Sequence, residues 1–405
     1  MRKEKNRVAI IVPAKLPVPP VQGGAIESTI QLIIDQNEVY KKLAITIFSP
    51  FNKKAFLESK KYKETRWFWI YHGIFYKFCD FLFRVVRKLF IKDLLTFDSY
   101  RLVKYMDHEK FDKILIHGNT NHLKGLSKMI PKEKLVFSVH ANIFKSLTEN
   151  NIEIGNSAVK FIAVSDFIKN KIATNCKVEP SKISVIKNTI ALDSFSAPIN
   201  ETEKLKIKEK YKINEDDIVI LFAGRIVENK GIKHLLKALK KIDNEFKFTF
   251  LVVGSFGSNF GRSNNVDSFG EELLDLAEEL NNKVIFTGFI HNTKLPVFHA
   301  ISDILAMPSL CDDAAPKVAM ETMASGLPII TTNDGGIPEY VCQKCGIIID
   351  RDQDEESFIN DLALVLRMLM DNRELRQKMG AEGKKHSINF SPSIYYQKYV
   401  ETIRN

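Results

Sequence analysis

Acidic side chains gather in residues 308–340, which read PSLCDDAAPKVAMETMASGLPIITTNDGGIPEY. Asp312 and Asp313 precede Pro316, a residue that suits the first turn of a helix, and Glu321 lies inside that predicted helix. The free backbone N–H groups at a helix N-terminus attract anions. Carboxylates and anion-binding backbone groups are therefore expected side by side in this stretch.

The same stretch continues into a second turn. The predicted helix ends at Gly326, a short apolar strand covers 327–330, and the turn at 333–336 opens another helix that carries Glu339. In an open α/β sheet, phosphorylated ligands bind beside the carboxyl ends of buried strands. The pattern predicts such a binding site here.

A cationic pair follows another buried strand. The predicted strand 218–223 runs into Gly224 and Arg225, and Lys230 precedes a helix that opens near Ile232. Arginine offers a planar fork for two phosphate oxygens, and lysine offers a mobile point charge. Either residue alone would be an ordinary surface ion-pair partner. Together, after a strand and a glycine, they predict a loop that binds a diphosphate.

The N-terminal third repeats the strand, turn and helix pattern. A buried strand at 8–12 leads to Gly23 and Gly24, and a helix starts near Ala25. This order offers backbone N–H groups to an anion, although two glycines alone are also typical of an ordinary βα turn. His117 and His140 each end an apolar strand, where a polar side chain faces the ligand edge of a parallel sheet. A single histidine is more often structural than catalytic.

The elements that position these residues indicate two domains. A chain of 405 residues fits two ordinary domains. Apolar strands alternate with helical segments twice over, which predicts two doubly wound parallel sheets. The polar, proline-containing segment 197–202 is the expected linker. Residues 1–190 carry 33 Lys+Arg against 17 Asp+Glu, a net charge of +16, and the remainder carries −6. A basic first half favours phosphate-bearing or acidic partners.

Residues 66–92 interleave aromatic side chains with basic ones, among them Arg66, Lys77, Arg84 and Lys92. An amphipathic helix with an aromatic face and a basic rim can lie in a membrane interface. The same pattern also fits a helix packed on its own domain with solvated lysines. The periodicity does not separate the two interpretations, and the basic charge of the first half favours contact with an anionic membrane.

Several classes of site are not indicated. The five cysteines are scattered, which indicates a reducing compartment, and the lone CxxC at 342–345 is expected to be a coincidence. The N-terminus lacks a signal-peptide pattern, and no stretch has the length of a membrane span. The acidic run 350–356 has no metal-ligand spacing and is expected to be a solvated loop. Nucleic acid ranks last among partners because no nucleic-acid-binding motif is present.

Asp313, seven intervening residues and Glu321 resemble the paired-acid signature of the retaining GT-B glycosyltransferases of family 4, which usually have Glu at the first position. The segments PPVQGGAIE, SVHAN, ISVIKNTIALDSF and FAGRIVENKG resemble other segments of that family. The resemblance covers most of the chain and is weakest over residues 50–110. Within the family, the chain looks most similar to bacterial enzymes that build lipopolysaccharide core or capsule, including N-acetylglucosaminyl transferases.

The resemblance implies roles for individual residues. Asp313 would hold hydroxyls of the donor sugar, and Glu321 would hold the ribose. Arg225 and Lys230 would bind the diphosphate, and Ala315, Pro316 and Lys317 would bind the sugar and distal phosphate. Gly288 and Phe289 would contact the base, and Gly23 and Gly24 would face donor and acceptor. His140 would lie against the donor sugar, with His117 as a second candidate. The catalytic set is His140, Asp313, Arg225 and Lys230, and no metal or other cofactor is expected.

These expectations combine into one hypothesis. The fold class is α/β of the GT-B type, with two Rossmann-like doubly wound domains, a cleft between them and a C-terminal helix that crosses back to the first. The domains are 1–196, completed by 392–405, for the acceptor, and 197–391 for the nucleotide sugar. The expected function is retaining transfer of a hexose or N-acetylhexosamine from a nucleotide-diphosphate sugar, UDP-linked, to a lipid-linked or lipopolysaccharide/capsule glycan, in the cytoplasm at the inner face of the membrane. The alternatives are a nucleotide-sugar epimerase of the same fold and a non-catalytic nucleotide-sugar or glycan-binding protein.

Overall fold

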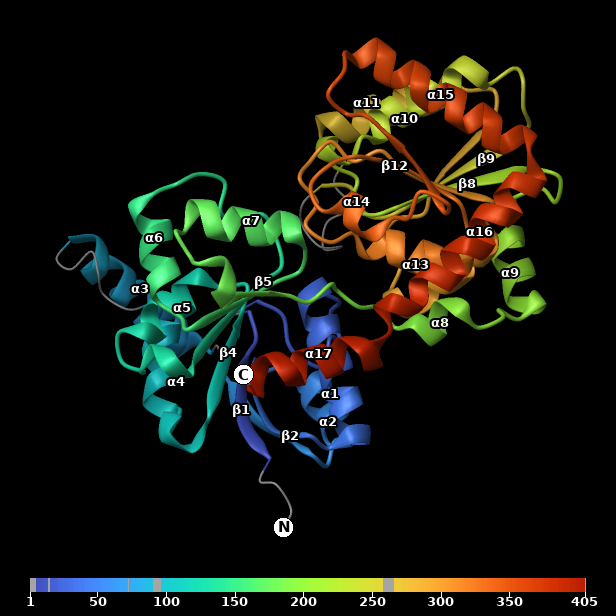
Figure 1. Ribbon diagram of the computed structural model, residues 1–405. Helices are drawn as coiled ribbons and strands as arrows, with labels where there is room; N and C mark the ends of the chain where they lie inside the picture. The colour runs from blue at the N-terminus through green and yellow to red at the C-terminus, as the bar shows by residue number, and fades with distance from the viewer. Residues whose placement is uncertain (1–4, 14, 72, 90–95, 258–265, 405) are drawn as a thin grey trace. The chain divides into compact units, whose positions relative to one another are not determined.

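The computed structural model describes residues 5–13, 15–71, 73–89, 96–257 and 266–404. The chain divides into two compact units (Figure 1). Unit 1 consists of residues 1–189 and 392–405, and unit 2 consists of residues 190–391. Each unit is an α/β body around its own parallel sheet, and the two are described in turn.

Unit 1 contains a seven-stranded sheet in the order β3-β2-β1-β4-β5-β6-β7, and every adjacent pair is parallel. Its strands are β1 (Asn6–Ile11), β2 (Leu43–Pro50), β3 (Thr65–Ile70), β4 (Lys113–His117), β5 (Leu135–Val139), β6 (Lys160–Ala163) and β7 (Ile183–Val185). The order reverses between β1 and β4, because β1 is continued on one side by β2 and on the other by β4. The carboxyl ends of β1 and β4 therefore flank the point where such sheets bind ligands.

The helices of unit 1 are α1 (Ala25–Tyr40), α2 (Lys53–Ser59), α3 (Ile74–Leu89), α4 (Phe97–Tyr105), α5 (Thr120–Ser127), α6 (Glu149–Asn156), α7 (Asp166–Asn175) and α17 (Pro392–Arg404). The last helix, α17, packs against α1 and buries Tyr395, Tyr396 and Tyr399 in the same core as β1 and β2. The hydroxyl of Tyr396 donates to Oδ1 of Asn37 at 2.5 Å. The end of the chain is thus an integral part of unit 1.

Unit 2 contains a six-stranded parallel sheet in the order β10-β9-β8-β11-β12-β13. The strands are β8 (Ile218–Ala223), β9 (Phe248–Val253), β10 (Lys283–Phe286), β11 (Ile304–Met307), β12 (Ile329–Thr332) and β13 (Gly346–Ile349). Its helices are α8 (Leu192–Ser196), α9 (Glu201–Tyr211), α10 (Ile232–Ile242), α11 (Ser268–Glu278), α12 (Leu295–Ala300), α13 (Lys317–Ser325), α14 (Ile337–Tyr340), α15 (Glu355–Asp371) and α16 (Arg373–Ser387).

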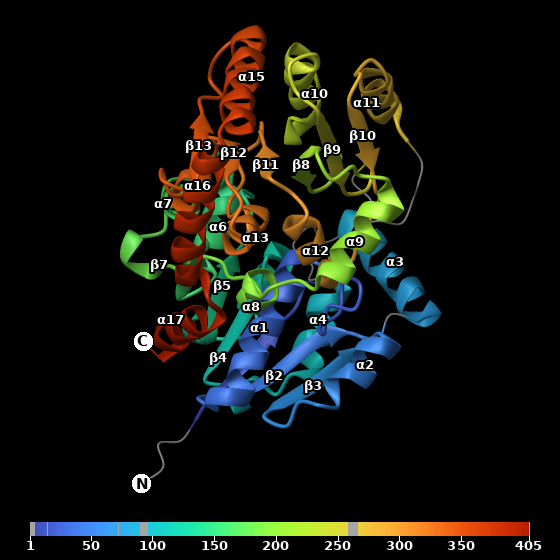
Figure 2. The ribbon, with the colours of Figure 1, turned by 90° about the vertical axis from the view of Figure 1, so that its right-hand side faces the viewer.

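Helices cover both faces of the second sheet (Figure 2). On one face, α10, α11 and α15 bury side chains such as Leu235, Leu273 and Leu362. On the other, α8, α12 and α13 contribute residues such as Phe298 and Met320. With both faces buried, the strands are continuous apolar runs, which is the pattern the sequence carries. The prediction of two Rossmann-like, doubly wound α/β sheets is confirmed.

Several element boundaries also agree with the sequence analysis. α1 begins at Ala25, β5 covers 135–139, β8 covers 218–223 and α10 begins at Ile232, each as predicted. Ser165 accepts a hydrogen bond from the backbone N–H of Ile168 and caps α7. These starts are set by local chemistry, an N-cap hydroxyl or a glycine turn, which is readable from sequence.

The prediction of one amphipathic helix across 66–92 is wrong in its first part. Residues 65–70 form the edge strand β3, and the helix α3 begins only at Ile74. Bulky aromatic residues such as Trp67 and Trp69 favour strands, and pairing with β2 outweighs the helical periodicity. Lys92 lies outside the described residues, and so do the side chains of Lys77, Arg84, Arg87 and Lys88.

Two smaller observations concern expectations about chemistry. Within the described part of the chain, no helix has both the length and the apolar character that crossing a membrane requires.

Cys342 and Cys345 are joined by a disulfide, whereas the sequence analysis expected their spacing to be a coincidence. Cys345 is buried, and its sulfur lies 3.5 Å from that of Met323 in α13.

Candidate active site

The strand order of unit 2 reverses between β8 and β11, and the loops after these strands carry the predicted site residues. The first loop, residues 224–231, follows β8 and ends at the start of α10. The second, residues 308–316, follows β11 and ends at the start of α13; we call it the donor loop. Ligands of doubly wound sheets bind where such loops separate. The topology therefore places the cationic pair and the paired acids at one edge of one sheet.

Gly231 explains how closely the two loops approach. It adopts a left-handed conformation with φ of 71°, and a Cβ added there would lie 1.9 Å from the carbonyl oxygen of Pro308. Only glycine permits that contact. The backbone N–H of Leu310 also donates to the carbonyl of Asn229 at 2.9 Å. The loop after β8 is thus fixed against the start of the donor loop.

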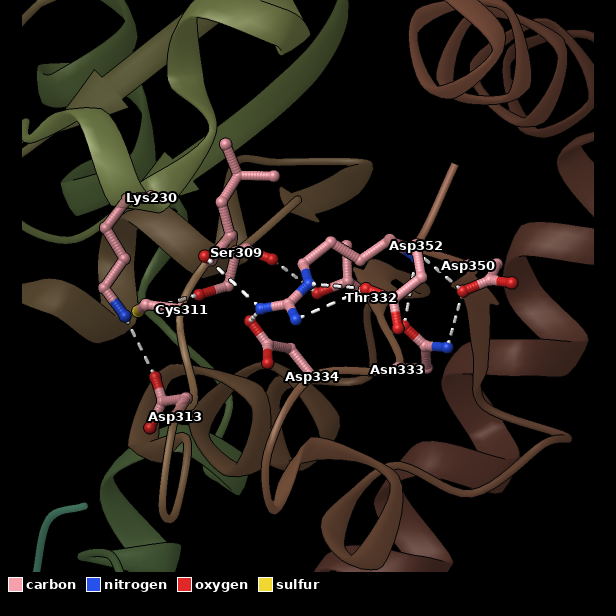
Figure 3. Close-up of polar contacts among 11 residues, drawn as sticks. Lys230, Ser309, Cys311, Asp313, Thr332, Asn333, Asp334, Asp350 and Asp352 are labelled. Carbon is pink, nitrogen blue, oxygen red and sulfur yellow. Dashed lines mark hydrogen bonds and ion pairs between the residues drawn. The ribbon is translucent and has the colours of Figure 1, made fainter. Parts of the chain in front are cut away.

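This approach brings Lys230 and Asp313 together. The Lys230 Nζ donates to Oδ2 of Asp313 at 3.0 Å, and both side chains are about four-fifths buried, with exposed fractions of 21% and 23% (Figure 3). Burial is the largest single effect on Lys230 and lowers its pKa, but the charges of Asp313 and Cys311 and the hydrogen bond to Asp313 together outweigh it, and the net pKa is raised. Lys230 therefore stays an ammonium ion. A mostly buried, charge-paired cation at a strand end can bind an anionic group once its carboxylate partner turns to another ligand.

The backbone of Asp313 is held from the other side by the turn after β12. The N–H of Gly336 donates to the carbonyl of Asp313 at 2.7 Å. Gly335 adopts φ of 54°, and a Cβ there would lie 2.6 Å from the same carbonyl oxygen. Asp313 also accepts a hydrogen bond at Oδ1 from the N–H of Ala315 at 3.3 Å. Two neighbouring turns thus fix both the backbone and the carboxylate of this residue.

Helix α13 carries the second acid. Pro316 is its N-cap, Lys317 is its first residue, and Glu321 lies one turn further along. Burial raises the pKa of Glu321 to about 7, while the charge of Lys317 lowers it. A carboxyl group with such a pKa changes charge near neutral pH. In this position it can accept hydrogen bonds from hydroxyl groups of a ligand at the start of the helix.

The remaining predicted residues of unit 2 lie at the ends of neighbouring strands. Arg225 is exposed and follows β8, and its charge acts on Lys230, where it lowers the pKa. Gly288 and Phe289 follow β10, and the Phe289 side chain is 53% exposed. Gly288 forms an isolated bridge to Gly254 at the end of β9. The ends of β8, β9 and β10 thus continue the same edge of the sheet.

In unit 1, the predicted glycines lie between β1 and α1. Gly24 is the N-cap of α1 with φ of 108°, and a Cβ there would meet Glu27 Oε2 at 2.1 Å. Glu27 is buried, and it fills the space that the glycine leaves. A Cβ on Gly23 would meet nothing within 4 Å. Gly24 is therefore required by close packing in the loop itself, and Gly23 borders open space.

The two histidines form a pair. His117 at the end of β4 and His140 just after β5 lie with Nδ1 of His117 2.9 Å from Nε2 of His140. Ser138 Oγ lies 3.0 Å from the same Nε2. His117 is fully buried, and burial lowers its pKa to about 3, so it stays neutral. Its own Nε2 has no hydrogen-bond partner among the described residues, which favours the tautomer in which Nδ1 carries the proton and donates to His140.

The structure thus brings together Lys230 with Asp313, and His117 with His140, within their respective units. The sequence analysis placed both histidines at strand ends but treated them as separate candidates. β4 and β5 are neighbours in the sheet, and this brings the two histidines at their ends together. Motifs in the sequence do not give the strand order on which this contact depends. The sequence also predicts that residues 350–356 form a solvated loop, whereas Arg351 in this run forms an ion pair with the buried Asp334.

Two family models match this chain. The model "Glycosyltransferase Family 4" matches residues 82–194, and the model "Glycosyl transferases group 1" matches residues 203–386, the part that contains the donor loop. The chain is a glycosyltransferase. The enzyme class predicted from the paired acids and the cationic pair is confirmed.

Relatives and solved structures agree with this assignment. The enzyme is 25% identical to spore coat protein SA of Bacillus subtilis, over 94% of each chain. It is 27% identical to the lipopolysaccharide 1,2-N-acetylglucosaminetransferase of Salmonella typhimurium, over 78% of each chain. Its structure resembles a glycosyltransferase of Rickettsia africae (TM-score 0.76, 21% identity, 99% and 98% coverage) and Anabaena HepE in complex with UDP and glucose (TM-score 0.73, 17% identity, 98% and 99% coverage). The glycosyltransferase has the GT-B fold that the sequence predicted.

Proposed function

We propose that the enzyme is a retaining glycosyltransferase that moves a hexose or N-acetylhexosamine from a UDP-linked donor to a lipid-linked or lipopolysaccharide/capsule glycan. The observation that carries the proposal is the Lys230–Asp313 contact at 3.0 Å, where the strand order of unit 2 reverses. A cation for the diphosphate and an acid for sugar hydroxyls lie side by side there. The Salmonella relative, an N-acetylglucosaminetransferase, supports an N-acetylhexosamine, and the UDP-bound Anabaena protein supports UDP.

The donor would occupy the carboxyl edge of the sheet in unit 2. Glu321 accepts hydrogen bonds from the ribose, Gly288 and Phe289 contact the base, and Asp313 turns from Lys230 to the sugar hydroxyls. The backbone at Ala315, Pro316 and Lys317 cradles the sugar and the distal phosphate at the start of α13, whose unpaired N–H groups favour anions. The second helix of this region, α14, has four residues and adds little dipole.

In the transfer step, the bond between the anomeric carbon and the diphosphate oxygen breaks. The acceptor oxygen forms its bond to the same face of that carbon, and the acceptor proton leaves with the diphosphate. Arg225 and Lys230 stabilise the charge that develops on the leaving diphosphate, which is the main catalytic contribution in this proposal. Because these two cations neutralise the diphosphate, we propose that no metal ion is needed.

Unit 1 would bind the acceptor, and His140 is its candidate residue for contact with a sugar. The contact between Nδ1 of His117 and Nε2 of His140 fixes the His140 ring. Gly23 and Gly24 keep the loop after β1 close to the ligand. The basic character of residues 1–190 suits an acceptor that carries phosphate or acidic sugars.

The proposal is tested by thermal stabilisation of the full chain against a panel of nucleotides and nucleotide sugars, since ligands that bind only the folded state raise Tm. A shift with UDP and a larger one with a single UDP-sugar are expected. A shift with GDP or ADP compounds alone would overturn the donor assignment. No shift with any nucleotide at millimolar concentration would contradict the donor site.

Retention is tested separately by the anomeric configuration of the product. The donor sugar identified in the panel is supplied with an acceptor, and the product is examined by proton NMR. An anomeric coupling equal to that of the donor linkage is expected. The opposite configuration would show inversion and would exclude same-face attack.

We also propose that α3 contacts an anionic membrane, which places the enzyme on the cytoplasmic surface. Tyr76 and Phe83 of α3 pack on Phe97 of α4. Phe78 and Phe81 of the same helix are 58% and 61% exposed, as expected for an interfacial face. Exposed large apolar side chains at helical spacing mark an interaction surface.

Flotation with vesicles that contain one-third phosphatidylglycerol tests this contact. The variant Phe78→Ser/Phe81→Ser should lose most of the vesicle binding that the wild-type chain shows. The control Leu364→Ser/Met368→Ser removes two exposed apolar side chains, 60% and 42% accessible, from α15 of unit 2 and should bind as the wild type does. Equal binding by all three chains would contradict the role of α3.

A further inference from the structure

The donor loop is supported from behind by residues of the β12 and β13 ends. Arg351 follows β13, and its guanidinium donates to Oδ2 of Asp334 at 2.9 Å. The same nitrogen lies 3.5 Å from the carbonyl oxygen of Leu310, in the donor loop. The side chain of Asp334 is 2% exposed, and that of Arg351 is 32% exposed. A nearly buried carboxylate and a half-buried guanidinium thus link β13 to the donor loop.

Asp334 extends this link to the residue next to Asp313. The carboxyl of Asp334 interacts with that of Asp312, and this interaction helps to raise the pKa of Asp334. Burial is the largest cause of the raised pKa, the charge of Arg351 lowers it, and the net value is about 6. Polar contacts therefore run from Arg351 through Asp334 to Asp312, the residue next to Asp313, whose own contact with Lys230 is drawn in Figure 3.

Neighbouring contacts fix the donor loop and Arg351, which this network of polar contacts connects. Thr332 Oγ1 donates to the carbonyl of Ser309 at 2.7 Å, at the start of the donor loop. The backbone N–H of Arg351 donates to Oδ1 of Asn333 at 3.0 Å. Asn333 in turn donates from Nδ2 to Asp350 at 2.8 Å. Arg351 is therefore itself fixed by its backbone, and its side chain reaches the donor loop from a rigid base.

We propose that Arg351 and Asp334 are positioning residues for the donor sugar: they hold the donor loop so that Asp313 reaches the sugar while Lys230 is released to the diphosphate. The inference rests on the proposed function of the donor loop. The contacts of Arg351 and Asp334 go to residues 310 and 312, ahead of Asp313. The nucleotide is assigned to other elements, α13 and the ends of β8 and β10. Loss of the support should therefore weaken binding of the sugar and spare binding of the nucleotide.

A purely structural role for the pair makes a different prediction. Removing Arg351 leaves a buried carboxylate without its cation, which destabilises the fold as a whole. Replacing both charges at once removes that penalty. The double variant should then regain the stability of the wild type. If the Arg351–Asp334 pair contributes only to stability, the double variant should also regain ligand binding. Positioning requires the contacts themselves, so binding of the sugar should stay weak in the double variant.

The test is a set of calorimetric titrations of the full chain with UDP and with UDP-N-acetylglucosamine, or with the nucleotide and nucleotide sugar that stabilise it most. The variants are Arg351→Gln, Asp334→Asn and the two combined. The control Arg367→Gln breaks another arginine–carboxylate pair of unit 2, in which Arg367 donates twice to Glu245 at 2.6 and 2.5 Å. That pair is exposed and joins α15 to the turn between α10 and β9.

We expect all three variants to bind UDP within about twofold of the wild type and the UDP-sugar at least tenfold more weakly. The control should match the wild type for both ligands. Equal weakening for both ligands, full recovery in the double variant, or unchanged binding of the UDP-sugar would each overturn the inference. A wild-type chain that binds neither kind of ligand would overturn the proposed function itself, which this design separates from failure of the positioning role. If Arg351→Gln does not fold, Asp334→Asn keeps the shape of the carboxyl and decides the question.

Discussion

At the scale of single residues, the proposed function depends most directly on Lys230. It is a mostly buried cation at the switch point of unit 2, and its pKa stays high because the charges of Asp313 and Cys311 and the hydrogen bond to Asp313 together outweigh burial. Lys230→Met keeps the length of the side chain and removes the charge. Losing one group that stabilises a developing charge costs roughly 10²–10³-fold in kcat. We expect a loss of that size in initial-rate measurements of sugar transfer.

The matched control for this variant is Lys233→Met. Lys233 lies three residues further along, in α10, and pairs with Glu272 at 2.5 Å. It is partly exposed and belongs to no predicted ligand contact, so its replacement should change kcat by less than twofold. A loss of less than threefold for Lys230→Met, or an equal loss for both variants, would remove Lys230 from the transfer step.

Glu321 links the site to pH. Its folded pKa is about 7 against an ordinary value of 4.5, because burial disfavours the charged form. Between these values the folded chain holds a proton that the unfolded chain has lost, so this group's contribution to stability falls as pH rises from about 4.5 to about 7. Glu321→Gln removes that dependence. Denaturant unfolding should show the variant equal to the wild type near pH 4.5 and more stable by roughly 1–3 kcal/mol at pH 8.

The opposite slope would show that Glu321 is ionised and stabilised in the folded state, and would contradict burial as the dominant effect. The same variant should bind UDP more weakly at pH 8, because an ionised carboxylate is the stronger acceptor for ribose hydroxyls. In this prediction, the ionised carboxylate of Glu321 strengthens UDP binding and lowers the stability of the unliganded protein.

At the scale of elements, the turn 333–336 supports the donor loop through backbone contact. Gly335→Ala would introduce a Cβ 2.6 Å from the Asp313 carbonyl oxygen, at a residue with φ of 54°. The donor loop must then move. We expect at least a tenfold weaker affinity for the UDP-sugar, measured by calorimetry.

Gly257→Ala separates crowding from backbone strain. Gly257 also lies in unit 2 and has φ of 76°, but a Cβ there would meet none of the described residues within 4 Å. This control should be destabilised by about 1 kcal/mol for its conformation alone and should keep donor affinity. Equal affinity of both variants would show that the turn does not determine the position of the donor loop.

At the scale of the whole molecule, α17 allows the two units to be perturbed independently. Tyr396 is fully buried in unit 1, and its hydroxyl donates to Asn37 at 2.5 Å. Tyr396→Ala should cost about 3–5 kcal/mol of the stability of unit 1. Because unit 2 has its own cores, UDP should still raise the Tm of the transition that belongs to unit 2.

The exposed Tyr105, with 53% of its side chain accessible, provides the control, and Tyr105→Ala should leave the calorimetric scan close to that of the wild type. A single transition that shifts as one in Tyr396→Ala, with no separate response to UDP, would contradict independent stability of the two units.

Sequence reasoning found the sheets and the starts of many elements because these depend on local signals. Continuous apolar runs such as 135–139 and 218–223 can only be buried strands in an α/β chain, and glycine turns mark where helices begin. It failed at residues 65–70, where aromatic residues fit two periodicities and pairing with β2 decided the outcome. Such a choice depends on a distant partner strand that the local pattern does not contain.

The candidate site divides in the same way. Asp313, Glu321, Arg225 and Lys230 could be named from motifs, because each follows a strand and a turn. The contact of His117 with His140 and the support of the donor loop by Arg351 depend on which strands are neighbours. Arg351 lies 41 residues from Leu310 in the sequence, and no local pattern connects them.

The central claim is that a nucleotide sugar binds at the carboxyl edge of the sheet in unit 2, between Lys230 and Glu321. The most direct test is calorimetric titration of UDP into the wild-type chain and into Lys230→Met/Glu321→Gln, with folding of both confirmed by circular dichroism. We predict saturable binding by the wild type and a loss of at least 50-fold in affinity for the double variant. Binding of equal strength by both chains would place the nucleotide elsewhere and contradict the account.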